Sequence, residues 1–169
     1  MFPHEHLLAS LLPIVLYVVL RERQLPTQSV VFATVIGSQF PDLIDKPLAH
    51  QFGVIPSGRV FMHSLPFAIP IAACVIAYGW QTDRPQVAGA FVVAYLLHLL
   101  GDTYQVLRTG QIPADLLWPF VTAQTRPEVP FWAGTNGTNV QLWTIFSIVV
   151  LMMTLGVLTR DMLRQYKSC

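Results

Sequence analysis

The sequence predicts an all-α integral membrane protein, a bundle of about five transmembrane helices that forms one domain over residues 1–169. The chain is 53% hydrophobic and only 11% charged, whereas soluble domains are typically about a quarter charged. Its mean hydropathy is +0.52, and long apolar stretches alternate with short polar segments. A length of 169 residues suits one compact bundle better than two domains.

The first two spans are expected in the amino-terminal third. Leu7–Leu20 is apolar and, counted back to His4, approaches the roughly 20 residues that cross a bilayer. No basic segment or cleavage motif marks it as a signal peptide, so we expect it to remain in the protein. The second stretch, Ser29–Ile44, is the weakest of the five because residues 37–41 interrupt its end.

Three further spans follow. The third is Met62–Trp80, where Pro66 and Pro70 predict a kink or a late helix start. The fourth covers Gln86–Leu107 and the fifth Val140–Thr159. Between these two lies a long loop, residues 108–139, of the length that usually serves as a lid or binding loop.

A histidine and an aspartate interrupt the apolar fourth span. His98 and Asp102 are four residues apart, so a helix places them on one face with Cβ atoms about 5–6 Å apart. This spacing suits two metal ligands, and it equally suits a hydrogen-bonded pair in a core. An ionisable pair inside a membrane span is by default a functional-site hypothesis.

Five crossings place most ligand-type side chains at one membrane face. The start of the first span, the end of the second, the start of the third and the end of the fourth all meet there. The residues concerned are His4, Glu5, His6, Asp42, Asp45, His50, His63, His98 and Asp102.

Imidazole and carboxylate groups are ligands for a divalent metal ion, for which we expect zinc, with manganese or iron as alternatives. Cys74 and Cys169 form no metal-binding spacing. At such a site Arg59 suits an anionic substrate group or a developing oxyanion, or it anchors a helix at the interface. Asp45 or Glu5 would serve as the catalytic base.

The charged residues of the chain bear on its binding partners and on its orientation in the membrane. A net charge of +1 without a basic cluster argues against nucleic acid as a partner. We expect membrane lipid and a small-molecule or lipid substrate instead. Six Lys and Arg residues in the segments on one side against four on the other favour an outer amino terminus. The multi-pass protein would then lie in the cell membrane with its metal site at the extracellular face.

Five motifs occur in order: His6, PDLID at 41–45, GRVFMHS at 58–64, HLLGDTYQVL at 98–107 and LWPF at 117–120. Together they resemble the LexA-regulated, inner-membrane metal-dependent hydrolases of the YdjM type, and an archaeal-like branch in particular. The resemblance implies ligand or catalytic roles for five residues: His6, Asp42, His63, His98 and Asp102. Two positions depart from the family pattern, because Gly58 replaces a frequent histidine and Leu43 a frequent aspartate.

The leading hypothesis is a membrane-bound hydrolase of an ester or phosphoester in a lipid or membrane-proximal molecule. The alternative is a non-catalytic structural or binding membrane protein in which the same side chains form a buried polar network. A small transporter or channel is a third hypothesis, which the clustering at one end disfavours.

Overall fold

The computed structural model describes residues 3–122, together with Met152, Gly156 and Thr159. This part of the chain is all-helical, with four α-helices followed by a short 3₁₀ helix. Most of the predicted fifth span, Val140–Thr159, and most of the predicted long loop lie outside the described residues. The sequence prediction of an all-α fold is confirmed, and the number of spans stays a prediction.

The first helix, α1, covers Pro3–Glu22, and α2 covers Gln28–His50. Between them Thr27 caps α2 by accepting a hydrogen bond from the backbone N–H of Val30 at 3.4 Å. α2 is longer than the sequence predicted, because the helix continues through residues 37–41 and past Ile44. Packing against neighbouring helices compensates here for the low helix propensity of Gly and Pro.

The third helix, α3, covers Leu65–Gln81 and α4 covers Pro85–Arg108. The late start of α3, with a proline in its first turn, agrees with the prediction made from Pro66. His98 and Asp102 share one helix, α4, as predicted. A 3₁₀ helix, η1, follows at Ala114–Leu117.

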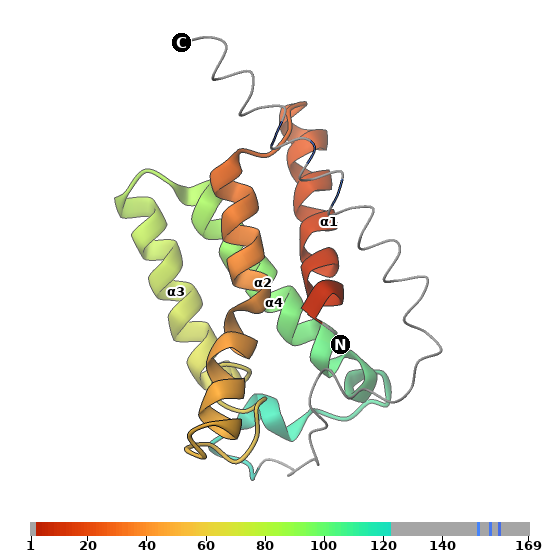
Figure 1. Cartoon of the computed structure of the whole chain (residues 1–169), viewed down its shortest axis with the longest axis vertical. Helices are drawn as coiled ribbons and strands as arrows, with labels where there is room; N and C mark the ends of the chain where they lie inside the picture. Colours follow the sequence, from red (N-terminus) through yellow and green to blue (C-terminus); the bar gives the residue numbers. More distant parts are fainter. Residues whose placement is uncertain (1–2, 123–151, 153–155, 157–158, 160–169) are drawn as a thin grey trace.

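α4 lies at the centre of the bundle and packs against α1, α2 and α3 (Figure 1). It comes close to α2 at Gly37, where an added Cβ would lie under 3.0 Å from the carbonyl oxygen of Phe91. Only glycine permits this distance, and small residues commonly allow such contacts between membrane helices. On the other side of α4, Tyr95 and Leu99 pack with Ala68 of α3.

Among the described residues, two helices are long and apolar enough to cross a membrane, α1 over His4–Glu22 and α4 over Pro85–Tyr104. α3 is apolar but shorter, with 17 residues. α2 does not qualify, because Asp42, Asp45 and Lys46 interrupt its second half.

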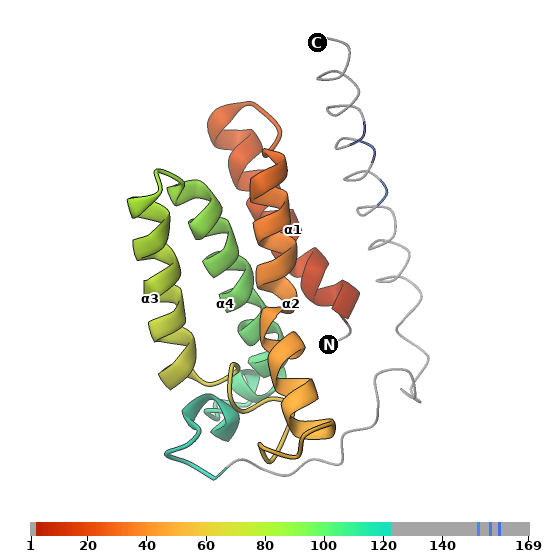
Figure 2. The same cartoon turned by 60° about the vertical axis from the view of Figure 1, so that its left-hand side comes forward.

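One end of the bundle carries the start of α1, the ends of α2 and α4, and the start of α3 (Figure 2). The α2–α3 loop and η1 cover this end. The segments that the sequence analysis expected at a common face therefore meet in the structure.

Candidate metal centre

Four side chains converge at this end of the bundle: Asp42, His63, His98 and Asp102. Each offers one ligand atom, and the four atoms lie within 4.8 Å of one another. α2 supplies Asp42, the loop before α3 supplies His63, and α4 supplies the other two. All four side chains are 8% exposed or less.

In most pairs within this group, the two ligand atoms lie farther apart than a hydrogen bond allows. His63 Nε2 lies 3.6 Å from Asp42 Oδ1 and 3.6 Å from Asp102 Oδ2. His98 Nε2 lies 3.8 Å and 3.9 Å from the same two oxygen atoms. A tetrahedral ion with bonds of about 2.0–2.2 Å separates its ligands by roughly 3.3–3.6 Å. The four atoms therefore surround a space that fits a small divalent ion.

The closest pair in the group is His63 Nε2 and His98 Nε2, which are 3.1 Å apart. His98 Nδ1 lies 2.6 Å from the backbone carbonyl of Ser38, which can only accept a hydrogen bond. His63 Nδ1 lies 2.8 Å from Asp45 Oδ2, which also accepts a hydrogen bond from the backbone N–H of His63. Each Nδ1 thus carries the proton, and in the neutral rings both Nε2 atoms present lone pairs to each other. A bound cation resolves this opposition.

Asp45 contacts the Nδ1 side of the His63 ring, opposite the Nε2 atom that faces the group, and so orients the ring. Its carboxylate accepts three hydrogen bonds, from His63 Nδ1 and from the backbone N–H groups of Met62 at 2.8 Å and His63 at 3.3 Å. The side chain is completely buried. A carboxylate behind a ligating histidine fixes the tautomer and the orientation of its ring.

The two carboxylate oxygen atoms of Asp42 have different surroundings. Lys46, one turn further along α2, holds Oδ2 at 2.7 Å. Oδ1 is buried and has no hydrogen-bond partner among the described residues. A buried carboxylate oxygen in this state is costly, and a cation at the centre of the group would compensate it.

Two basic side chains flank Asp102. His6 Nε2 lies 3.1 Å from Oδ1, and Arg59 Nε lies 3.2 Å from Oδ2. The His6 ring also stacks on His98, with centroids 3.7 Å apart and an interplanar angle of 19°. His6 was predicted as a ligand, but it is not part of the four-residue group and holds Asp102 and His98 from outside.

The pKa of His63 is raised above its ordinary value. Burial alone would lower it, but the carboxylates of Asp102, Asp45 and Asp42 outweigh burial by favouring the imidazolium form. The ring therefore faces strongly negative surroundings, which also favour a bound cation.

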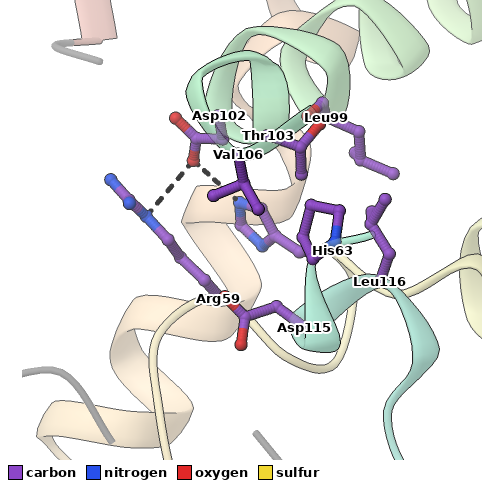
Figure 3. Close-up of a pocket in the computed structure, with 9 residues that line it drawn as sticks. Arg59, His63, Leu99, Asp102, Thr103, Val106, Asp115 and Leu116 are labelled. Carbon is purple, nitrogen blue, oxygen red and sulfur yellow. Dashed lines mark hydrogen bonds and ion pairs between the residues drawn. The ribbon is translucent and has the colours of Figure 1, made fainter. Parts of the chain in front are cut away.

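A narrow pocket opens beside the group, with room for about one water molecule. Figure 3 shows Asp102, Leu99, Thr103 and Val106 above the pocket on α4, with Arg59 and His63 on the loop and Asp115 and Leu116 below on η1. Of the three residues predicted as catalytic, only Arg59 lines the pocket. Asp45 lies behind His63, and Glu5, in the first turn of α1, is not among the lining residues.

Two groups near the site were not predicted from the sequence, the carbonyl of Ser38 and the side chain of Asp115. The carbonyl of Ser38 is a backbone group and carries no sequence signal. Asp115 has no ligand-like spacing to any other acid or histidine, and only its place two residues before the LWPF motif marks it.

The comparisons with known proteins agree with the motif resemblance. No curated protein and no solved structure matches the chain. The family model described as the YdjM inner membrane protein matches residues 1–163. Together with the two candidate membrane helices, this match indicates a membrane location. The chain belongs to the YdjM inner membrane protein family.

Proposed function

We propose that this protein is a membrane-bound, metal-dependent hydrolase that cleaves an ester or phosphoester of a lipid or membrane-proximal molecule. The observation that carries the proposal is the 3.1 Å separation of His63 Nε2 and His98 Nε2, beside two buried carboxylates and next to a pocket. A purely structural network would be expected to place a donor opposite each acceptor.

In this proposal Asp42, His63, His98 and Asp102 hold one divalent ion, most simply zinc, with manganese or iron as alternatives. Such an ion supplies two things when bound: it makes a water molecule acidic near neutral pH, and it polarises the ester. Histidine and carboxylate ligands without thiolate fit all three metals.

In this proposal, Arg59 binds the substrate, and His6 and Asp45 orient the metal ligands. Arg59 is one-third exposed beside Asp102, where a guanidinium attracts an anionic substrate group. His6 and Asp45 keep Asp102 and His63 in position. We therefore assign Asp45 an orienting role, since its carboxylate already accepts three hydrogen bonds. Glu5 keeps the proposed role of a base only if substrate reaches the start of α1.

The orientation follows from the charge count along the sequence. We propose a multi-pass protein of the cell membrane, folded as one domain, with the metal site at the extracellular face. Lipid or another substrate at the membrane surface would then meet the pocket near the end of the α4 span, Pro85–Tyr104.

The test is direct. The protein is purified in detergent, its metal content is measured by mass spectrometry, and hydrolysis of bis(p-nitrophenyl) phosphate and p-nitrophenyl butyrate is followed with and without a chelator. We expect about one equivalent of a transition metal and chelator-sensitive turnover. Less than about a tenth of an equivalent, in protein both as purified and after metal supplementation, would refute the proposal.

A further inference from the structure

Asp115 lies on the wall of the pocket, across from the metal-ligand group, and neither the motifs nor the family match assigns it a role. It belongs to η1, which apolar packing holds in place on both sides. Leu116 packs against the cluster of Ala68, Tyr95 and Leu99. Trp118, just after η1, packs against Phe67 with centroids 5.8 Å apart. A side chain carried by this element is therefore held at a defined place on the pocket wall.

Acidic groups that could transfer a proton in this pocket are few in the described part of the chain. The pocket lining includes two carboxylates, Asp102 and Asp115. Asp102 contacts His6 and Arg59 and belongs to the ligand group. Asp42 points into the ligand group from α2 and Asp45 lies behind His63, and neither is part of the lining.

We propose that Asp115 is the general acid and base of the reaction, an inference that rests on the proposed hydrolase function. Its carboxylate takes a proton from the attacking water as the new bond from oxygen to phosphorus, or to the acyl carbon, forms. The bond between that atom and the leaving oxygen then breaks. Asp115 returns the proton to the leaving alkoxide, so the products are an alcohol and a phosphate or carboxylic acid.

The position of Asp115 on the pocket wall suits a role in proton transfer. Figure 3 shows Asp102 and Asp115 on opposite sides of the pocket, with Arg59 and His63 between them. An attacking water in the pocket would have the ligand group and Arg59 on one side and the Asp115 carboxylate on the other. Positioned general acids and bases typically contribute about 10²- to 10⁴-fold in rate.

The experiment compares wild type, Asp115→Asn and Asp83→Asn in detergent. Asp83 is an exposed aspartate in the turn between α3 and α4 with a φ of 56°, a conformation that asparagine adopts readily. The α3–α4 turn that carries it lies at the opposite end of both helices from η1 (Figure 2), so Asp83→Asn makes a matched control. Three quantities are measured: bound metal, the affinity for inorganic phosphate by calorimetry, and the turnover of bis(p-nitrophenyl) phosphate.

We expect Asp115→Asn to keep its metal and to lose about 10²-fold or more in turnover. It should also bind phosphate about tenfold more tightly, because a negative charge facing the anion is removed. Asp83→Asn should match wild type in all three measurements. Asp115→Glu should recover part of the turnover.

Two outcomes overturn the inference and can be told apart. If wild type turns over and Asp115→Asn does so within about threefold, with unchanged phosphate affinity, only the role of Asp115 is wrong. If metal-loaded wild type hydrolyses none of the probes, the proposed function fails, and the role of Asp115 fails with it.

Discussion

His63 and His98 come from segments 35 residues apart and place their Nε2 atoms 3.1 Å from each other. Each ring donates its Nδ1 proton away from the other, to Asp45 and to the carbonyl of Ser38. This arrangement needs a cation between the rings and the two nearby carboxylates, either a metal ion or a proton. The two possibilities make different predictions.

Asp102→Asn separates a metal site from a structural polar network. The change is nearly isosteric, so a network should tolerate it, whereas a metal site loses an anionic ligand. We expect the zinc affinity to fall by more than about 100-fold, since losing a ligand should cost more than losing an outer-shell partner. Competition with a chelator measures the affinity. Unchanged metal content in a folded variant would favour the structural network.

Asp45→Asn tests the orienting role of Asp45. An asparagine amide can donate to His63 Nδ1, which would move the ring proton to Nε2 and block the ligand atom. We expect the metal affinity to fall by about 10- to 100-fold while the helical content is retained. The measurement is the same competition assay with circular dichroism beside it. An affinity within about twofold of wild type would show that Asp45 does not set the tautomer.

Gly37→Ala tests the contact between α2 and α4. Because the added Cβ would meet the backbone carbonyl of Phe91, the two helices must separate. We expect the free energy of unfolding in detergent to fall by about 1–3 kcal/mol. The metal affinity should fall too, because neighbouring Ser38 holds His98 through its carbonyl.

Gly89→Ala is the control for this prediction, because a Cβ at that position of α4 meets nothing within 4 Å. It should leave metal affinity unchanged and stabilise the protein slightly, by up to about 1 kcal/mol, since alanine favours a helix over glycine. Equal effects from the two substitutions would mean that the close approach of the helices at Gly37 is unimportant.

The raised pKa of His63 predicts how metal binding depends on pH. Since Nδ1 already carries a proton, the titrating proton enters at Nε2 and competes there with a metal ion. We expect the affinity to fall by up to about tenfold per pH unit below the raised pKa and to level off above it. Zinc competition assays between roughly pH 6 and pH 9 measure this dependence. A flat profile across that range would exclude His63 as a ligand.

The sequence by itself determined the helical fold class and the end of the bundle where the site lies. Apolar stretches separated by charged segments specify the helices, and the alternation of helix direction then brings His6, Asp42, His63, His98 and Asp102 to one end. The spacing of His98 and Asp102 already required a shared helix face, because both lie on one continuous helix.

Only the tertiary structure decided what each of these side chains does. Asp42 and Asp45 are three residues apart on α2. Asp42 directs its Oδ1 atom toward the four-residue group, whereas Asp45 binds the loop backbone and His63 Nδ1. His6 stacks on His98 instead of joining the four-residue group, and η1 brings Asp115 to the pocket. These differences depend on distances of a few ångströms and on ring orientation. They arise from contacts between distant segments, such as Gly37 with Phe91, which residue spacing along one helix does not encode.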